Sequence, residues 1–396
     1  MNILFVDDEP KVLMGIQRLL RPMRNEWNVL VAESARKALD IMKTTKIDVI
    51  VSDMMMPEIN GAQLLNEVAG LYPDIIRIVL SGHSDQELIY SLVGPAHQYL
   101  SKPCDLNILK DTINRAISLK QLLGSEPLKK AISQIDALPT LPNLYLQLLN
   151  ELQSNEPSMD RVGEIISKDI AMSAKILQLV NSAFFGLPQK IASPTEAALY
   201  LGIETIKALV LSIQLFKQFD TETVKAFSLE SLWSHSWTTA VLARKIATLE
   251  KMDQKTTDLS FSSALLHDIG KLILVKNLPA QFQESISLAR QENIPHWEAE
   301  QKIFGVSHAE IGGYLLGIWG IQNNLVEAVS LHHRPQFYQT NGLSVIIIVH
   351  LANALDHEKH LPDPSKLKNH LDLNWLNNSE FKEKFNNWRE LLWKTD

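Results

Sequence analysis

The sequence is poor in cysteine and in long apolar runs, and both shortages exclude classes of protein. Cys104 is the one cysteine among 396 residues, so no disulfide forms within the chain and a reducing compartment is expected. The longest apolar runs, such as residues 345–349, are too short to cross a membrane. The N-terminal apolar run ends at Asp7, too soon for a signal peptide. We therefore expect a cytoplasmic protein with no membrane span.

An excess of positive charge is also lacking. The 38 lysines and arginines are outnumbered by 45 aspartates and glutamates, which gives a formal net charge of -7. This balance disfavours bulk attraction to nucleic acid, and no basic helix-turn-helix is evident, so we expect no DNA partner. The chain does have an ordinary globular composition, 45% hydrophobic and 21% charged, and enough residues for two or three domains.

Short apolar runs alternate with amphipathic segments in the first 122 residues. Between the first two runs, apolar residues from Val12 to Met23 recur at helical spacing. Alternating strands and helices predict an α/β fold, in which a five-stranded parallel sheet is covered on both faces. The runs expected to form buried strands are residues 2–6, 28–32, 47–52, 75–81 and 97–101.

Polar residues lie where these predicted strands end. Asp7 and Asp8 follow the first run and Asp53 follows the third, while Ser81 ends the fourth and Lys102 follows the fifth. In a parallel sheet these ends share one edge, where three carboxylates would repel one another unless a hard cation such as Mg²⁺ joined them. A lysine and a hydroxyl beside that cation would balance a phosphoryl group. A single acid could merely cap a helix, but five such residues favour a phosphoryl site.

The motifs that carry these residues resemble a response-regulator receiver domain. They are VDDEP, SDMMMPEINGAQLL, LSG and YLSKP. The resemblance implies a doubly wound, flavodoxin-like sheet in which Asp53 accepts a phosphoryl group from a partner histidine kinase. It further implies Mg²⁺ binding by Asp8, Asp53 and the Met55 carbonyl with help from Asp7, phosphoryl contact by Ser81 and Lys102, and an aromatic switch at Tyr99.

From residue 128 on, strand alternation gives way to helical patterns separated by turns. We expect an all-helical domain with ridge-into-groove packing rather than a simple bundle. The segments that suit helices are residues 145–152, 160–180, 195–219, 231–249, 259–269, 280–292, 296–303, 308–319, 322–332 and 343–356.

Histidines and acids that suit a transition-metal site are spread along this helical half. Taken singly, most of them would be ordinary core or surface residues. The pair His267–Asp268 precedes Gly270, where a helix can stop, so both side chains could face one cleft, and Lys271 adds a cation for a phosphate. The other candidates are His235, His308, His332 and His333, and the group His350, Asn353 and Asp356, which shares one helical face.

This arrangement resembles the HD superfamily of metal-dependent phosphohydrolases, and specifically its HDOD branch of signalling output domains. The motifs are LWSHSWTTAVLARKIA, ALLHDIGKLIL, FGVSHAEIGGYLLGIWGI and LHHRP, preceded by segments such as ISKDIAMSAKILQLVNSAFFG. The resemblance runs from about residue 136 to residue 356. It implies an output domain that binds other signalling proteins, without an established catalytic activity.

Two departures from the HD pattern bear on catalysis. No Gly-Tyr-Pro signature follows the histidine pair, so hydrolysis of cyclic di-GMP is not expected. Asn353 stands where the HD family usually has an aspartate ligand, and Asp356, one turn later, either substitutes for it or lies on the surface. His235, His267 and Asp268 remain of the basic ligand set. They could hold a metal with a water in the open position, or they could be a structural relic.

Two interpretations of the whole chain follow. We favour a two-component response regulator in which phosphorylation of Asp53 shifts the receiver between states and changes what the output domain binds. The alternative is a phosphorylation-gated, metal-dependent phosphohydrolase acting on a nucleotide or another phosphoester. Its catalytic candidates would be His267, Asp268 and Lys271. The expected partners are a cognate histidine kinase and a downstream signalling protein.

The predicted domain limits are 1–122 for the receiver, 123–135 for a helical linker, 136–360 for the HDOD domain and 361–396 for a helical tail. A heptad-like pattern in residues 106–124 leaves a homodimer open, although a receiver helix with a helical linker accounts for it better. The segment 181–189 is a candidate contact surface or core packing. In the tail, Phe381, Phe385, Trp388 and Leu392 share one stripe, which favours a docked terminal helix over a partner surface.

Overall fold

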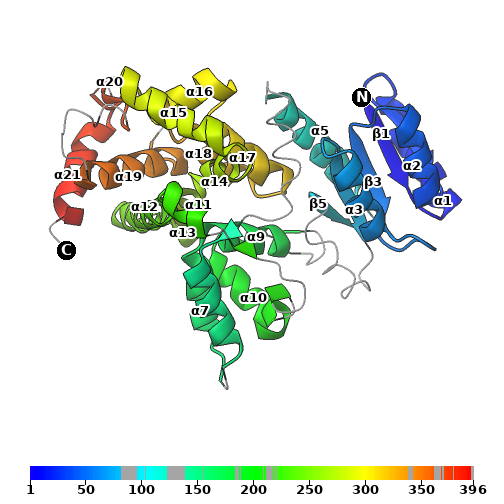
Figure 1. The fold of residues 1–396 in the computed structure, drawn as a ribbon, viewed down its shortest axis with the longest axis horizontal. Helices are drawn as coiled ribbons and strands as arrows, with labels where there is room; N and C mark the ends of the chain where they lie inside the picture. Colours follow the sequence, from blue (N-terminus) through cyan, green and yellow to red (C-terminus); the bar gives the residue numbers. More distant parts are fainter. Residues whose placement is uncertain are drawn as a thin grey trace.

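The computed structural model of the chain has an N-terminal part built on a sheet and a larger helical part (Figure 1). The sheet-based part lies at one end of the elongated molecule, and the C-terminal helix α21 lies at the other. The residues that the structure describes are 1–81, 96–102, 104–122, 139–154, 156–182, 187, 189–207, 209–210, 217–218, 221–337, 342–360, 367, 370–377 and 379–393.

The N-terminal part confirms the predicted five-stranded parallel sheet. Its strands are β1 (Asn2–Val6), β2 (Asn28–Ala32), β3 (Val49–Asp53), β4 (Ile76–Ser81) and β5 (Gln98–Ser101), in the order β2-β1-β3-β4-β5. Every neighbouring pair is parallel. The central strand β3 is buried along its whole length, which explains why continuous apolar runs, rather than alternating residues, mark these strands.

Different helices bury the two faces of the sheet. On one face, Ile3 and Phe5 belong to the same apolar cluster as residues of α1 (Pro10–Leu20) and α5 (Leu106–Leu122). On the other face, Leu4 and Val6 cluster with residues of α2 (Ala35–Thr44) and α3 (Gly61–Leu71). The doubly wound class is therefore confirmed, and the carboxyl ends of β1, β3 and β5 lie at one edge.

The rest of the described chain is largely helical, as predicted. A pair of two-residue parallel strands, β6 (Pro139–Thr140) and β7 (Lys217–Gln218), adds to the helices. The helices are α7 (Pro142–Leu152), α8 (Met159–Ser167), α9 (Ile170–Val180), α10 (Pro194–Lys207), α11 (Thr221–Ala226), α12 (Leu229–Leu249), α13 (Gln254–Leu266), α14 (Ile269–Asn277), α15 (Pro279–Glu292), α16 (His296–Phe304), α17 (His308–Ile318), α18 (Asn323–Leu331), the short η4 (Pro335–Phe337), α19 (Val345–His360), α20 (Leu373–Asn377) and α21 (Phe381–Trp393).

Some of the predicted helical segments are divided in the structure. The segment 160–180 forms α8 and α9, because the Asp169 carboxylate accepts a hydrogen bond from the Met172 N–H and begins a new helix. The segment 259–269 also divides, since α13 ends at Leu266 and α14 begins at Ile269. The expectation that a helix stops at Gly270 was wrong, because Gly270 lies inside α14.

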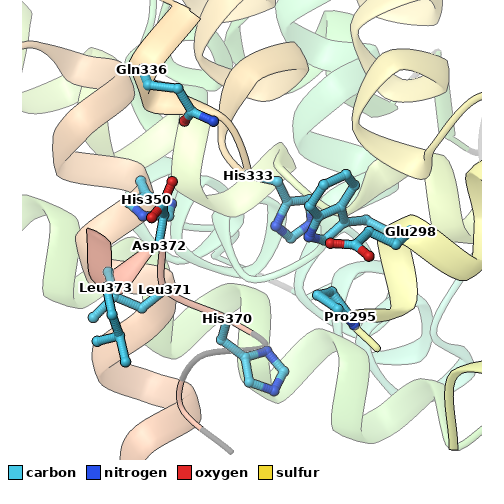
Figure 2. A pocket seen from close by; sticks show the side chains of 10 residues that line it. Pro295, Glu298, His333, Gln336, His350, His370, Leu371, Asp372 and Leu373 are labelled. Carbon is cyan, nitrogen blue, oxygen red and sulfur yellow. The ribbon is translucent and has the colours of Figure 1, made fainter. Parts of the chain in front are cut away.

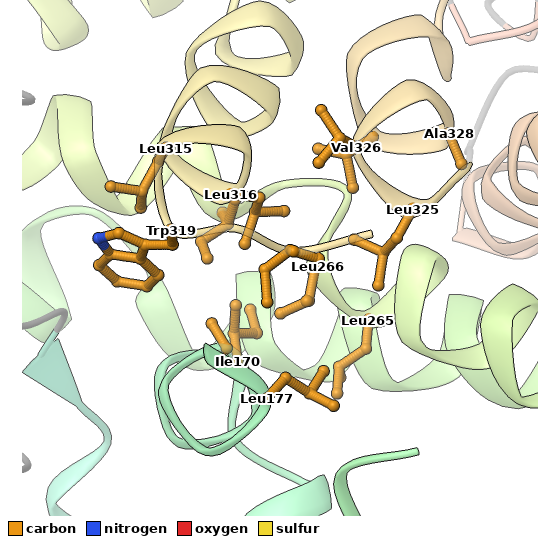
Figure 3. Close-up of a cluster of buried hydrophobic side chains, with 14 of the residues drawn as sticks. Ile170, Leu177, Leu265, Leu266, Leu315, Leu316, Trp319, Leu325, Val326 and Ala328 are labelled. Carbon is orange, nitrogen blue, oxygen red and sulfur yellow. The ribbon is translucent and has the colours of Figure 1, made fainter. Parts of the chain in front are cut away.

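The helical core lies where α9, α13, α17 and α18 meet. Figure 3 shows Ile170 and Leu177 of α9 in one buried cluster with Leu266 of α13 and Leu316 of α17. The core continues into the receiver, because one cluster of buried apolar side chains includes residues of both parts and α5 packs against α17. The two parts are therefore in direct contact through α17.

The C-terminal helix docks on the helical part, as its apolar stripe predicts. Phe381, Phe385 and Trp388 are buried, and the Trp388 indole N–H donates to Glu250 Oε1 at 3.1 Å at the end of α12. The side chain of Leu392 and residues 183–186 and 188 of the predicted contact segment lie outside the described residues. Among the described helices, none has the length and apolar character that a membrane span requires.

Candidate functional site

The carboxyl edge of the receiver sheet gathers the predicted phosphoacceptor residues. Asp7 and Asp8 follow β1, Asp53 ends β3, and one carboxylate oxygen from each lies within 4.8 Å of the others. The Lys102 ammonium lies 2.7 Å from Asp7 Oδ2 and 2.6 Å from Asp53 Oδ1. Gly61 permits this geometry, because a Cβ there would lie 2.1 Å from the Asp53 carbonyl oxygen. The sheet topology therefore brings together residues that are far apart in the sequence.

The charges at this edge suit a bound divalent cation. Burial raises the pKa of Asp53, and the contact with Lys102 partly opposes that rise. Burial lowers the pKa of Lys102, but its contacts with Asp53 and Asp7 outweigh burial and raise it, so Lys102 stays cationic. One lysine does not neutralise three carboxylates. The surplus of oxygen donors fits Mg²⁺, which prefers such ligands and keeps several waters.

The structure describes the other candidate residues of the receiver site less completely. Tyr99 in β5 is buried, and burial raises the pKa of its phenol. Met55 follows Asp53 by two residues with an exposed side chain, and the role of its carbonyl stays a prediction. Ser81 ends β4, but its side chain lies outside what the structure describes. Asp7, Asp8, Asp53 and Lys102 are thus the residues whose geometry supports the site.

In the helical part, the histidines predicted as ligands come together around Asp268. His235 lies in α12, His267 and Asp268 occupy the break between α13 and α14, and His308 is the first residue of α17. His332 and His333 directly follow α18. Two sets of donor atoms result, each within 4.8 Å, formed by His235, His267 and Asp268 and by His308, His332 and His333.

Four of these imidazoles are oriented in the same way. Each places Nδ1 against an oxygen, which requires a proton on Nδ1 and directs Nε2 into the cluster. In His308 the Nε2 atom also faces Asp268, and the contacts with Glu300 and Asp268 outweigh burial and raise the pKa of this ring. A metal-binding histidine is typically held by such a bond from its second nitrogen. The pairs are His235 Nδ1 with Asp356 Oδ2 at 2.5 Å, His267 Nδ1 with the Ala264 carbonyl at 2.6 Å, His308 Nδ1 with Glu300 Oε2 at 2.6 Å and His332 Nδ1 with the Val329 carbonyl at 2.7 Å.

The Nε2 atoms point toward one another. His235 Nε2 lies 3.2 Å from His267 Nε2, and His308 Nε2 lies 3.0 Å from His333 Nε2. Lone pairs at such distances repel unless a proton or a metal ion lies between them. His332 Nε2 is buried and has no hydrogen-bond partner among the described residues. The donor set therefore fits one or two borderline metal ions such as Zn, Mn, Fe or Ni.

Asp268 lies between the two sets of donor atoms and places its negative charge beside residues of both. Its Oδ1 is 3.0 Å from His308 Nε2, and its Oδ2 is 3.5 Å from His267 Nε2 and 2.6 Å from Lys271 Nζ. Burial alone would raise the pKa of Asp268, but the charges of His267, Lys271 and His308 hold it well below its ordinary value. Burial lowers the pKa of His267 to about 4, so near neutral pH this ring is a neutral donor.

The alternatives for the last ligand are decided by burial. Asp356 is 3% exposed and bonds His235, so it is not a surface residue. Asn353 is buried on the same helix, and its Oδ1 has no hydrogen-bond partner among the described residues. His350 lies beside the cluster rather than in it, with Nδ1 donating to the His332 carbonyl at 2.7 Å. Asp356 thus contacts the cluster through His235, and its role as a metal ligand stays a prediction.

The sequence did not single out Glu300, which proves central to the second set. It is fully buried in α16, and it accepts bonds from both the backbone N–H and Nδ1 of His308. Burial alone would raise the pKa of Glu300, but the charge of His308 outweighs burial and lowers it. The spacing of His296 and Glu300 on one helical face was the available signal.

A cavity of about 500 Å³ reaches this cluster from solvent. Its lining includes His235, Asp268, Lys271 and Asp356, together with hydroxyls of α12 such as Thr238. Lys271 adds a cation beside the metal donors, where a phosphate oxygen would be attracted. The arrangement is therefore able to bind a phosphoester next to a metal ion.

Gly270 is what allows α14 and α17 to approach closely enough to form the cluster. A Cβ at this position would lie 2.0 Å from the His308 carbonyl oxygen, which is backbone and cannot move aside cheaply. We expect Gly270→Ala to lower the free energy of unfolding by about 3 kcal/mol. Gly15→Ala is the matched control, because nothing lies within 4 Å of its Cβ, and it should stabilise helix α1 slightly. Equal urea midpoints for the two variants would contradict the proposed close approach.

Comparison with known proteins agrees with the division of the chain into an N-terminal receiver part and a helical part. The family pattern described as the HDOD domain matches residues 138–335, and the response regulator receiver domain matches residues 3–114. The chain therefore belongs to the HDOD family and carries an N-terminal response regulator receiver domain. Receiver domains generally bind Mg²⁺, in agreement with the acidic edge of the sheet.

Individual relatives cover parts of the chain. An uncharacterized protein of Treponema pallidum (strain Nichols) is 24% identical over 294 residues, which are 73% of this chain and 54% of that protein. The hydrogenase transcriptional regulatory protein HoxA of Cupriavidus necator is 36% identical over 31% of this chain and 25% of its own length. This chain thus spans about half the length of the first relative and a quarter of the second.

Solved structures with similar folds include response regulators. The MmoQ response regulator from Methylococcus capsulatus str. Bath is 24% identical, covering 59% of this chain and 92% of that chain with a TM-score of 0.47. A response regulator receiver domain protein from Clostridium thermocellum is 35% identical, covering 31% of this chain and 98% of that chain with a TM-score of 0.29.

Proposed function

We propose that a histidine kinase phosphorylates Asp53 and that this event switches the HDOD domain, which acts by binding another signalling protein. The observation that carries the proposal is the position of α17. This helix packs against α5 of the receiver and begins at His308 of the histidine cluster. A change in the receiver that moves α17 would therefore also move the cluster. A homodimer and a cytoplasmic location remain predictions.

Further contacts at this interface support the proposal. Gln178 Nε2 of α9 donates to the His97 carbonyl just before β5 at 3.4 Å. Gly320, directly after α17, faces Gln98, because a Cβ on it would lie 3.5 Å from Gln98 Oε1. The strand that carries Tyr99 and leads to Lys102 therefore touches the output domain directly. A phosphoryl group at Asp53 would act on that strand through Lys102.

Trp319 provides an optical test of this coupling. It lies between α17 and Gly320, with the Lys175 ammonium 4.9 Å from the centre of its ring. Beryllium fluoride with Mg²⁺, a stable mimic of a phosphoryl group, should change tryptophan emission of the full chain. The change should disappear in Trp319→Phe and in Asp53→Asn. An emission change that is as large in Trp319→Phe as in the unaltered chain would count against coupling through α17.

A second candidate function is favoured by the converging Nε2 atoms and the adjacent cavity. We propose that the cluster binds a transition metal and that the HDOD domain hydrolyses a phosphoester when the receiver permits it. A bound metal would supply an activated water and polarise the phosphoryl group. Asp268 would hold the metal, Asp356 would orient His235, and Lys271 would neutralise a phosphate oxygen. A screen of phosphoesters with metal-loaded protein, using Lys271→Met as the comparison, tests this candidate.

A further inference from the structure

A second cavity, of about 520 Å³, lies beside the histidine cluster, with His333, His350 and His370 in its lining (Figure 2). Glu298 of α16 and His333 lie on one wall, and the ring of Trp297 in α16 stacks on His333. His350 of α19 and Asp372 lie across the cavity from them, and His370 lies below. The C-terminal segment therefore completes a binding-sized space that is separate from the phosphoacceptor and shares His333 with the second donor set.

The lining of this cavity offers hydrogen-bond acceptors and flat rings. The carboxylates of Glu298 and Asp372 face it, and none of the described residues that line it is a lysine or an arginine. Asp372 Oδ1 accepts from the Trp375 N–H at 2.9 Å, which fixes this carboxylate at the start of α20. The Trp297 and His333 rings stack on each other with their centres 5.7 Å apart, and the Arg334 guanidinium lies 4.9 Å from the centre of the Trp297 ring. The two carboxylates favour a planar group that carries N–H donors.

One buried nitrogen at the cavity has an unused lone pair. His350 lines it and is 1% exposed, and its Nδ1 proton is committed to the His332 carbonyl. Its Nε2 has no hydrogen-bond partner among the described residues. A buried acceptor in this state is costly unless a ligand donates to it. The observation adds a third acceptor to the two carboxylates.

The cavity is joined to the metal donors by a shared residue. His333 lines the cavity, and its Nε2 lies 3.0 Å from His308 Nε2 in the second donor set. His370 of the cavity stacks on His357 of the Lys271 cavity, with ring centres 3.7 Å apart. A ligand seated on the rings would therefore have one end beside the metal donors, where a bound metal ion would supply the positive charge for a phosphate.

We propose that this cavity is the base-binding part of a nucleotide site and takes a base that bears an amino group. The base would donate N–H groups to Glu298 and Asp372 while its plane lies against the surrounding rings. Its phosphate would point toward the histidine cluster. The base contact stands without a metal, whereas the phosphate contact rests on the metal site of the second candidate function.

Binding of matched nucleosides to the full chain tests the proposal. Guanosine carries an amino group that inosine lacks. Cytidine carries an amino group where uridine has a carbonyl oxygen. Measured by equilibrium dialysis, the amino-bearing member of at least one pair should bind at least tenfold more tightly than its partner. Asp372→Asn, which keeps the cap on α20, and Glu298→Gln should each weaken that binding about tenfold. Glu327→Gln, on an exposed face of α18, should leave it unchanged.

The outcomes separate the base pocket from the metal site. Two results together support both the base pocket and the metal site. The nucleoside should still bind after chelation, and the nucleoside monophosphate should bind more tightly than the nucleoside only when metal is present. Amino-group discrimination without any metal-dependent gain for the monophosphate supports the base pocket and counts against the metal site. Equal binding within both nucleoside pairs, or no nucleoside binding, would overturn the proposed base pocket. Displacement of the bound nucleoside by spermidine, which has amino groups but no base, would overturn it as well.

Discussion

Asp53→Asn should abolish phosphorylation of the chain by acetyl phosphate in the presence of Mg²⁺. Asp53 ends the central strand β3 and lies 2.6 Å from the Lys102 ammonium, in a set of three carboxylates that can share one cation. An amide in its place has no carboxylate oxygen to attack the phosphoryl donor. Intact-mass measurement should show one added phosphoryl group on the unaltered chain and none on the variant.

Asp40→Asn is the matched control for this experiment. Asp40 is an exposed acid of α2 that pairs only locally with Lys43 at 2.7 Å. Its replacement should leave phosphorylation at the level of the unaltered chain. Lys102→Met should slow phosphorylation at least tenfold, since it removes the cation that faces both Asp7 and Asp53. Phosphorylation of Asp53→Asn to the level of the control would refute the assignment of the acceptor.

Asp268→Ala should remove a bound transition metal from the helical part. Asp268 contributes to the first donor set, and its other oxygen lies 3.0 Å from His308 Nε2 of the second. Without Asp268, the histidines whose Nε2 atoms face one another would have no negatively charged metal ligand beside them. Elemental analysis of protein purified without chelator or immobilised nickel should find about one or two metal ions per chain. The variant should retain less than a tenth of that content.

Two further variants show whether the loss is specific. Asp356→Asn should weaken metal affinity by about 10- to 100-fold, because Asp356 only orients His235. Asp160→Asn, an exposed acid of α8, should bind metal like the unaltered chain. Circular dichroism should show the same helix content for all three. The absence of stoichiometric metal from the unaltered chain would make the cluster a structural relic.

Much of the receiver could be predicted because its inner strands β1 and β3 are buried. Burial makes such a strand a continuous apolar run, so β1 begins and ends at the predicted residues, and the apolar run of the half-buried edge strand β2 also matches its bounds. In a parallel sheet the ends of such strands share one edge, so Asp53 and Lys102 could be paired before any contact was measured. The sequence pattern gives no sign that Gln98 of β5 faces Gly320 of the output domain.

The histidine cluster was predicted by residue type more than by geometry. His267 and Asp268 are adjacent in the sequence and face one site because the break between α13 and α14 directs both inward. The choice between Asn353 and Asp356 depended on the rotation of α19, which spacing does not fix. Glu300 was missed because its contact with His308 arises from how α16 is packed against α17.

Hydrogen exchange of the full chain with and without beryllium fluoride tests most directly whether the receiver controls the output domain. We predict that the phosphoryl mimic changes the exchange rates of amides in α5 and also in α17, the helix that connects the receiver to His308. Asp53→Asn should show neither change. Altered exchange confined to the receiver strands and α5, with α17 unaffected, would contradict the proposed coupling.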